Sequence, residues 1–504
     1  EVKGVSTPVR VLELAGAGAL RTRFDVSRSR GLSRFVGRVY ETAALDAALE
    51  RALAGDAPVV GVVAEAGVGK SRLCFELLER CRARGIPTTV ASGVAHGKAV
   101  PLLPILDLMR SYYGIADHDP ASVAREKIAG KLLLLDESFR DSLPLLFETL
   151  GVADPQRPLP VLDPDVRQRE LFDLWRKVVQ LRGRSEPTVT LVEDLHWFDA
   201  ASEAFLEPMV DARPGTRALL VLNFRPEFHA SWMQRSWYQQ LPLRPLGAEA
   251  QQELLRELLG TDESLAGLAA RLAERTGGNP FFMEETVLSL AESGALTGSR
   301  GSYRLARPLE AISVPATVQA ILGARIDRLP EREKALLQTA SVVGGELSES
   351  LLREVAELPD RDLSGALRAL VRGEFLYEVA FYPEPEYVFK HPLTREVAYQ
   401  SQLAPRRARV HATVARALEA MNPAGTGEHA ALLAHHYEAA GEALPAARWH
   451  DRAAHFALRA DYAEARRHWE RVRALAGGLP ESIESADLVA AACAQLLRAG
   501  SRLG

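Results

Sequence analysis

The chain has few cysteines, no long apolar run and no strong excess of charge of one sign. Its three cysteines, Cys74, Cys81 and Cys493, show neither zinc-ligand spacing nor a disulfide framework, so we expect a reducing, cytoplasmic setting. No apolar run approaches the roughly 18–20 residues that cross a bilayer, and no signal peptide is visible. A net charge of −5 gives no global attraction to nucleic acid. We therefore expect neither a membrane nor a nucleic acid as partner.

The overall amino-acid composition is ordinary for a globular protein. Apolar residues make up 47% and charged residues 25% of the 504 positions. At about 100–200 residues per domain, this length predicts three or four domains. The first residue is Glu1 rather than methionine, from which we expect a piece of a longer protein.

The most informative segment is a glycine-rich loop between an apolar run and a helical pattern. Residues 59–63, all valine or glycine, predict a buried strand, and residues 72–78, beginning at Arg72, predict a helix. The loop between them reads Ala64-Glu65-Ala66-Gly67-Val68-Gly69-Lys70-Ser71. Loop amides and the helix N-terminus hold a triphosphate, Lys70 reaches its outer phosphates, and Ser71 offers a hydroxyl to Mg²⁺. The segment therefore predicts a P-loop nucleotide site.

This loop departs from the strict pattern at its first position, where glycine is replaced by Ala64. Alanine is tolerated there because only the later glycines, Gly67 and Gly69, need close backbone approach. The flanking strand and helix favour the P-loop interpretation over a chance match.

Two adjacent carboxylates, Glu193 and Asp194, follow the apolar run of residues 189–192. Carboxylates at the tip of a neighbouring strand can hold the Mg²⁺ shell and polarise the attacking water. By position Glu193 lies nearer the metal and Asp194 nearer the water, but either carboxylate can serve in either role. The predicted metal ligands are Ser71, Glu193 and Asp194.

Further polar residues follow the predicted strands. We favour a positional role for His196 over a catalytic one. Arg225, just after the predicted strand of residues 218–222, is either a sensor of the γ-phosphate or a member of a surface salt bridge. Residues 277–280 are Gly-Gly-Asn-Pro, which is either a generic turn or the hinge of a lid with Pro280 packing on adenine; we favour the lid.

The pattern along the chain predicts an α/β core, a parallel sheet with helices on both faces, followed by helical modules. Residues 375–379 and 387–389 predict a hairpin among helices, and hence a winged-helix-like module. Alanine-rich helices after residue 430, with a roughly 34-residue spacing, predict tetratricopeptide-like repeats. The expected domains are 1–33 (end of a preceding domain plus linker), 34–235 (P-loop core), 236–312 (helical lid), 313–425 (winged-helix-like module) and 426–504 (repeats, truncated).

Four histidines lie in the helical half, at His411, His435, His436 and His450. His435 and His436 point about 100° apart on a helix, so they do not form a joint ligand pair. We expect ordinary packing of these residues rather than a metal site.

Together these motifs resemble the signal-transducing P-loop ATPases with numerous domains, a branch of the AAA+-related nucleotidases. The resemblance covers about residues 34–504. The matching stretches are Phe35-Val36-Gly37-Arg38, residues 64–71, Glu193-Asp194-Leu195-His196-Trp197, Arg225, residues 277–280, residues 324–330 and residues 389–399.

This resemblance implies a slow ATP-driven switch that uses ATP and Mg²⁺. It implies adenine recognition near Phe35, Val36 and Arg38, and catalysis by Lys70 together with the acidic pair and Arg225. ATP would close the lid and the winged-helix-like module over the core, and hydrolysis would release them. The repeats would hold a protein or small-molecule inducer.

The combination is most similar to the ATPase and repeat half of bacterial class III adenylate/guanylate cyclase fusion proteins. Residues 1–14 resemble the last strand of such a cyclase domain. The cyclase catalytic residues would then lie upstream, so this chain could not make cyclic AMP by itself.

The sequence thus favours an ATP-binding, slowly hydrolysing regulatory module of a bacterial signalling protein. A non-hydrolysing, nucleotide-gated scaffold is the first alternative, motivated by Ala64 and the Glu-Asp order. An ATP-dependent transcription regulator is the second, although no basic recognition helix is evident.

Overall fold

The computed structural model of the chain describes residues 32–93, 102–116, 119–160, 162–344, 346–380, 384–421, 427–458, 462–480 and 482–500. The predicted cyclase remnant therefore lies, up to residue 31, outside the described residues. Within them, no helix combines the length and apolar character of a membrane span.

A five-stranded parallel sheet forms the centre of the N-terminal half, in the order β2-β3-β4-β1-β5. The strands are β1 (Val59–Val63), β2 (Thr88–Ser92), β3 (Thr188–Glu193), β4 (Ala218–Phe224) and β5 (Tyr238–Pro242). Every residue of β1 and β4 is buried, as expected for central strands with both faces covered. The predicted parallel sheet is confirmed.

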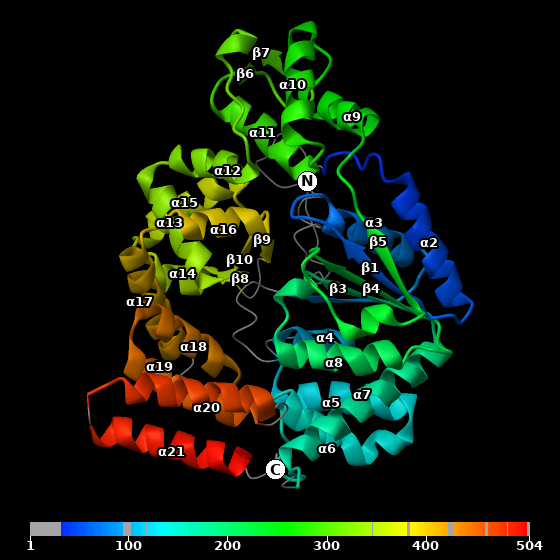
Figure 1. The fold of residues 1–504 in the computed structure, drawn as a ribbon, viewed down its shortest axis with the longest axis vertical. Helices are drawn as coiled ribbons and strands as arrows, with labels where there is room; N and C mark the ends of the chain where they lie inside the picture. Colours follow the sequence, from blue (N-terminus) through cyan, green and yellow to red (C-terminus); the bar gives the residue numbers. More distant parts are fainter. Residues whose placement is uncertain are drawn as a thin grey trace, which may run out of the picture.

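Helices cover both faces of this sheet (Figure 1), which is also as predicted. On one face α2 (Val39–Leu53) and α3 (Lys70–Ala83) pack against Val60, Val62 and Val221. The other face, with Val59 and Leu222, is covered by helices of a larger cluster. These are α4 (Leu103–Tyr113), α5 (Ala121–Leu135), α6 (Leu143–Thr149), α7 (Pro164–Ser185) and α8 (Ala200–Asp211).

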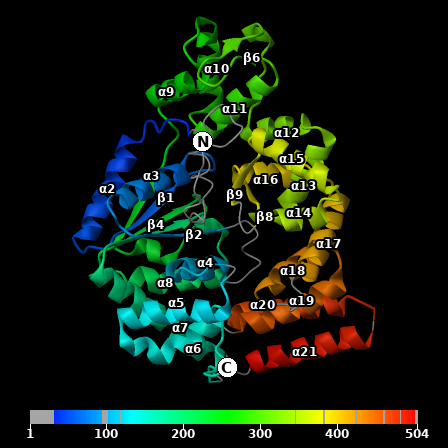
Figure 2. The ribbon, with the colours of Figure 1, turned by 180° about the vertical axis from the view of Figure 1, so that it is seen from behind.

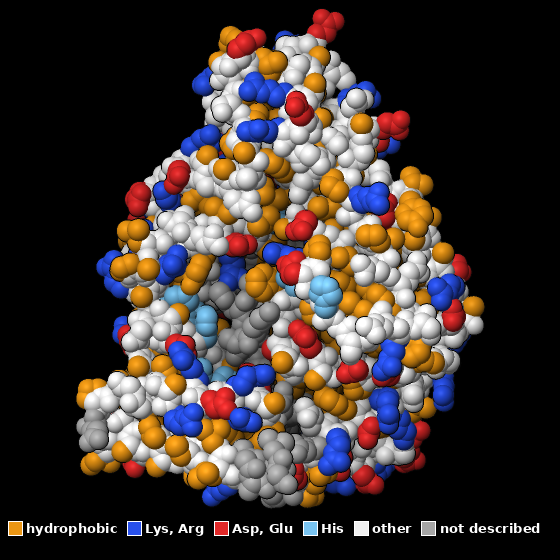
Figure 3. Space-filling model, in the orientation of Figure 1, with side chains coloured by type: hydrophobic (Ala, Val, Ile, Leu, Met, Phe, Trp, Pro, Cys, Tyr) orange, Lys and Arg blue, Asp and Glu red, His pale blue; other side chains and the backbone are white. Residues whose placement is uncertain are grey.

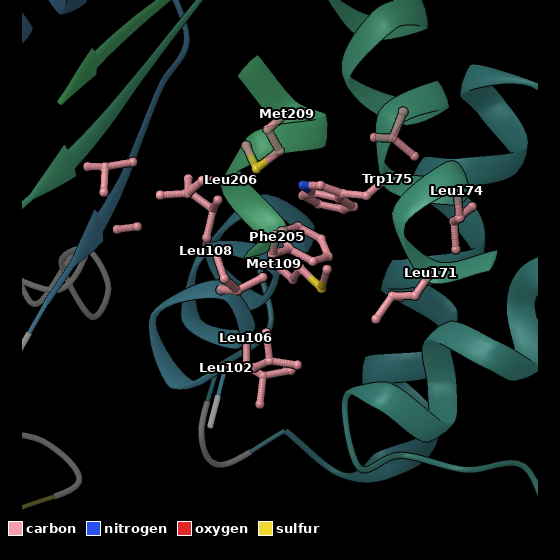
Figure 4. Packing of buried hydrophobic residues seen from close by; sticks show 14 of the residues in the cluster. Leu102, Leu106, Leu108, Met109, Leu171, Leu174, Trp175, Phe205, Leu206 and Met209 are labelled. Atoms are coloured by element: carbon pink, nitrogen blue, oxygen red, sulfur yellow. The ribbon is translucent and has the colours of Figure 1, made fainter. Parts of the chain in front are cut away.

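The larger cluster is built around aromatic and methionine side chains. Figure 4 shows Trp175 of α7 reaching toward Met209 and Phe205 of α8, with Leu108 of α4 beside them. The Trp175 and Phe205 ring centroids lie 6.3 Å apart. Cys74 and Cys81 of α3 are buried on the opposite face of the sheet, in agreement with their interpretation as core residues.

A small helical unit follows the sheet and lies at the top of Figure 1. It contains α9 (Ala248–Leu259), α10 (Ala266–Thr276), α11 (Pro280–Glu292) and the hairpin β6 (Leu296–Thr297) and β7 (Arg304–Leu305). Gly277 ends α10 in the left-handed conformation, with φ of 56°. The Asn279 side chain then caps α11, and Pro280 occupies the first helical position.

The next unit combines helices with a three-stranded antiparallel sheet, ordered β8-β10-β9. Its elements are α12 (Val318–Asp327), α13 (Glu331–Val343), β8 (Glu346–Ser348), α14 (Glu349–Val355), α15 (Asp360–Arg372), β9 (Leu376–Ala380), β10 (Glu386–Phe389) and α16 (Pro392–Gln400). The predicted hairpin is β9–β10. This hairpin is confirmed, and β8 adds a third strand that is too short to leave a pattern in the sequence.

The chain ends in a stack of helices, each packed against the next. They are α17 (Ala404–Met421), α18 (Gly427–Ala440), α19 (Ala443–Ala457), α20 (Tyr462–Gly477) and α21 (Ile483–Gly500). Small buried residues such as Ala434 and Ala446 pack beside Tyr437 and Trp449, as the repeat pattern predicts.

The stack lies on the opposite side of the molecule from the parallel sheet and returns to the core at its base (Figures 1 and 2). Leu103, the first residue of α4, packs against the repeat cluster that contains Trp449. The front face is hollowed between the two sides (Figure 3).

Candidate functional site

The predicted P-loop joins β1 to α3 at the carboxyl end of the sheet. Gly67 and Gly69 adopt φ values of 82° and 108°, which disfavour any side chain. Ala64 is buried and is not among the described residues with positive φ. The alanine at the first position is therefore accommodated without backbone strain.

Lys70 lies at the start of α3 and is 7% exposed. Its Nζ donates to the carbonyl oxygens of Ala64, at 2.6 Å, and of Glu65, at 3.1 Å. Burial lowers the pKa of Lys70, while the nearby Asp194 carboxylate opposes the shift. The ammonium is thus folded back over the loop whose amides would face a phosphate.

Glu193 is the last residue of β3 and Asp194 is the next residue, and the two carboxylates have different surroundings. Asp194 has a left-handed backbone, with φ of 51°, and its amide donates to Asn223 Oδ1 at 2.8 Å. Asn223 Nδ2 in turn donates to Glu193 Oε1 at 3.3 Å. Asp194 lines the same cavity as Lys70, whereas Glu193 is not on its wall. This division was not visible in the sequence, because it depends on Asn223 of the adjacent strand.

Arg225 follows β4 and also lines the cavity. Its guanidinium lies 5.6 Å from the centre of the Trp197 ring, and within the described residues it forms no ion pair. His196 lies beside Trp197, with ring centroids 5.1 Å apart, but does not line the cavity. Burial lowers the pKa of His196 to about 4, and neither ring nitrogen has a hydrogen-bond partner among the described residues. This geometry fits the positional role.

The segment before α2 forms another wall of the cavity, with Phe35, Val36 and Arg38. Arg38 donates to the carbonyl oxygen of Val68 in the P-loop at 2.9 Å, so this segment is fastened to the loop. Arg72 lies 5.6 Å from the centre of the Phe35 ring. The resemblance implied adenine recognition here, and the residues concerned do gather around one cavity.

The start of α11 contacts the P-loop directly. Asn279 Nδ2 donates to the carbonyl oxygen of Ala66 at 3.0 Å, and the Phe281 amide donates to that of Gly67 at 3.4 Å. A Cβ atom on Gly67 would lie 2.8 Å from Asn279 Oδ1. Pro280 also lines the cavity, whereas the sequence gave no sign of the contact that Asn279 makes with the P-loop.

The unit that contains the three-stranded antiparallel sheet closes the far side of the cavity with Lys390 and His391. The rings of Phe281 and His391 are stacked, with centroids 3.8 Å apart. Lys390 pairs with Glu285 of α11 at 3.1 Å and with Glu374 at 2.6 Å. The resemblance implied that this module closes over the core, but the sequence did not indicate which of residues 389–399 line the cavity.

The resulting cavity has a volume of about 320 Å³, which suits a small-molecule ligand. Most of the predicted binding residues line it; Ala64 and Glu65 do not, and instead bind Lys70 through their carbonyl oxygens. Ser71 and Asp194 add oxygen atoms of the kind that Mg²⁺ prefers. The residues present therefore fit a nucleotide and its divalent cation.

Comparisons with known proteins agree with this geometry in the core. A sequence model of the AAA ATPase domain matches residues 34–222, and a domain of unknown function (DUF8739) matches residues 247–302. An uncharacterised protein of Rhizobium meliloti (strain 1021), R02095, is 27% identical over 458 residues. That match covers 88% of this chain, and the chain spans only 43% of the length of that relative.

Two solved structures of archaeal ATPases are similar at 14% identity. One is a signal transduction ATPase with numerous domains and a tetratricopeptide repeat sensor, from Pyrococcus horikoshii. It has a TM-score of 0.44, with 91% of this chain and 60% of that chain covered. The other is a Walker-type ATPase of Pyrococcus abyssi, with a TM-score of 0.31 and coverages of 72% and 95%.

The match over residues 34–222 spans the P-loop, the acidic pair and four strands of the sheet. The prediction of a P-loop ATPase core agrees with this match, because residues 34–222 are similar to the AAA ATPase domain.

Proposed function

We propose that the chain is an ATP-binding, slowly hydrolysing regulatory switch module of a multidomain bacterial signalling protein. The observation that carries this proposal is the shared cavity. Its walls come from the P-loop core, from α11 and from the segment before α16. A nucleotide there would contact all three units, so a change at its γ-phosphate would alter how they are held together.

In the proposed reaction the loop amides and Lys70 bind the phosphates of ATP. Asp194, on the cavity wall, orients the attacking water and accepts its proton, while Arg225 faces the charge that develops on the γ-phosphate. Ser71 and Asp194, which line the cavity, are the proposed oxygen ligands for the cation, whereas the predicted ligand Glu193 does not line it. When bound, Mg²⁺ neutralises phosphate charge.

The adenine is proposed to lie between the segment of Phe35 and Val36 and the start of α11 at Pro280. Arg38 and Arg72 hold that segment by donating to the carbonyl oxygens of Val68 and Ser33, respectively. Binding of the base would therefore couple the segment before α2 to the P-loop.

The remaining parts of the proposal concern the rest of the signalling protein. The helical stack would bind a protein or small-molecule inducer, as repeats of this kind offer extended surfaces. Residues 1–14 resemble the end of a cyclase domain, so we propose an adenylate/guanylate cyclase upstream as the output. Buried free thiols at Cys74 and Cys81 support a cytoplasmic setting.

The test compares ATP binding and phosphate release by the purified chain and by Lys70→Ala. We expect the variant to lose turnover by about 100-fold or more, because it lacks the ammonium over the phosphates. Lys334→Ala is the control, since Lys334 pairs with Asp327 at 2.7 Å, outside the cavity. Equal turnover by all three proteins, or no ATP binding by any, would overturn the proposal. Tight ATP retention without phosphate release would instead favour the non-hydrolysing scaffold.

A further inference from the structure

A second, smaller cavity lies at the opposite end of the parallel sheet from the nucleotide site. It has a volume of about 40 Å³ and is lined by residues of α4, α7 and α8 and of the strands β2, β3 and β4. Trp175 and Met209, seen side by side in Figure 4, form part of its wall. Arg213, in the loop between α8 and β4, lines it as well.

Arg213 is 1% exposed, yet two nitrogen atoms of its guanidinium lack partners among the residues that the structure describes. Its Nε and Nη1 atoms have no hydrogen-bond partner within the described parts of the chain. No carboxylate contributes to its electrostatics: burial alone lowers the pKa of Arg213, to about 9. The group therefore stays charged near neutral pH, and an isolated buried charge is costly unless an ion or polar group compensates it.

The other polar groups around the cavity suit a negative ion. Thr89, Thr188 and Thr190 line it from β2 and β3, where Thr89 pairs with Thr190 in register. Arg182 is a second cation on the wall, and its partner is Glu186 at 3.1 Å. Of the residues that the structure describes, no acidic one lines the cavity. The wall is thus cationic, hydroxylated and otherwise apolar.

The volume limits what can enter. A water molecule needs roughly 10–15 Å³ of such space, so 40 Å³ admits a halide-sized ion with a water molecule or two. A nucleotide or a peptide side chain with its backbone is too large. Two nitrogen donors of one guanidinium and neighbouring hydroxyls are the groups that would replace the hydration shell of a small anion.

We propose that this cavity is a binding site for a monovalent inorganic anion of chloride size, held by Arg213. The anion compensates the buried guanidinium and fastens the loop between α8 and β4 beneath the sheet. The site is independent of the proposed ATPase function, because it shares no lining residue with the nucleotide cavity.

The test uses bromide as the probe in two experiments. In the first, crystals of the full chain are grown with bromide. In the second, thermal unfolding of the full chain is compared in potassium bromide and in potassium gluconate at equal ionic strength. We expect an anomalous bromine peak within contact distance of Arg213. We also expect a saturable rise of about 2–4 °C in the unfolding midpoint in bromide relative to gluconate.

Arg213→Met should remove this bromide response, whereas Arg217→Met should keep it. Arg217 is the matched control because it lies in the same loop but is only partly buried, and its guanidinium donates to the carbonyl oxygen of Ser185. If Arg213→Met does not fold, the bromine peak in the unaltered chain decides the question. No bromine peak in the cavity, or equal bromide responses in both foldable variants, would overturn the proposal.

Discussion

The side-chain amide of Asn279 donates to the main-chain carbonyl of Ala66 over 3.0 Å, and so joins the start of α11 to the P-loop. The same side chain caps α11 by accepting from the Phe282 amide at 3.1 Å. One residue thus sets both where the helix begins and where it rests on the loop.

Asn279→Ala should weaken ATP binding about fivefold, the equivalent of one hydrogen bond of about 1 kcal/mol. It should also lower the free energy of unfolding by about 1 kcal/mol through loss of the cap. Ser348→Ala is the matched control, because Ser348 caps α14 in the same way without touching the P-loop. Calorimetric titration and denaturant unfolding measure the two effects. An unchanged ATP affinity in Asn279→Ala would contradict the link.

Gly67→Ala should reduce ATP affinity more than tenfold. Its positive φ strains any side chain by about 1–2 kcal/mol, and the new Cβ would lie 2.8 Å from Asn279 Oδ1. Gly85→Ala shares the positive φ, at 70°, but its Cβ meets nothing within 4 Å. Both variants should have a lower free energy of unfolding, and only Gly67→Ala should have a lower affinity for ATP. The prediction fails if calorimetry gives the same ATP affinity for both.

Asp194→Asn should keep ATP binding but lower turnover by about 100-fold or more, since the amide cannot accept the proton of the attacking water. Asparagine tolerates the left-handed backbone at this position, so the fold should be retained. Asp211→Asn, at the end of α8 and exposed, is the control for loss of a carboxylate. Steady-state phosphate release is the measurement, and wild-type turnover in Asp194→Asn would exclude this carboxylate as the base.

Glu285→Gln should lower the free energy of unfolding by about 3–5 kcal/mol. Glu285 is 1% exposed and pairs with both Arg325 and Lys390, so its neutralisation leaves two cations short of a partner. Burial lowers the pKa of Lys390, but the two carboxylates beside it outweigh burial and raise the value above normal. Glu470→Gln removes a surface pair with Arg466 and should cost less than about 1 kcal/mol. If chemical denaturation gives similar losses of unfolding free energy for Glu285→Gln and Glu470→Gln, the buried charge cluster does not stabilise the fold as expected.

Stability should fall as the pH drops below about 6.5, because buried histidines in the repeats resist protonation. His411 Nδ1 lies 2.9 Å from His436 Nδ1, and His450 Nδ1 lies 2.8 Å from His468 Nδ1. Burial lowers the pKa of His411 to about 4 and that of His468 to about 3.

The sign of the pH effect follows from these shifts. Unfolded histidines take up protons at about pH 6.5, whereas His411 and His468 in the folded chain do not until far lower pH, so acid favours the unfolded state. His468→Phe should reduce the slope of stability against pH between 6 and 4.5 by up to about 1.4 kcal/mol per pH unit. His455→Phe, at a half-exposed site, should leave the slope unchanged. If the slope of stability against pH is equal in the two variants, the buried histidines are not the cause of the loss of stability in acid.

The sequence was sufficient for elements whose signal is local and continuous. The apolar runs of β1, β3 and β4 predicted buried parallel strands because both faces of a central strand must be covered. The edge strands β2 and β5 were missed, because their mixed composition, with Thr88 and Gln239 among apolar residues, leaves no continuous run. The P-loop was found because its glycines, Lys70 and Ser71 are adjacent in the chain.

The amino-acid sequence by itself determined the loop that receives phosphate, the neighbouring acids and the helical character of the second half, since each depends on residues within about one turn or strand. Only the tertiary structure decided which groups face one another. Asn279 reaches Ala66 across 213 positions, His391 stacks on Phe281, and Arg213 is buried without a described partner. Such pairings depend on how whole elements pack, because side-chain contacts over a few ångströms are set by three-dimensional placement rather than by spacing along the chain.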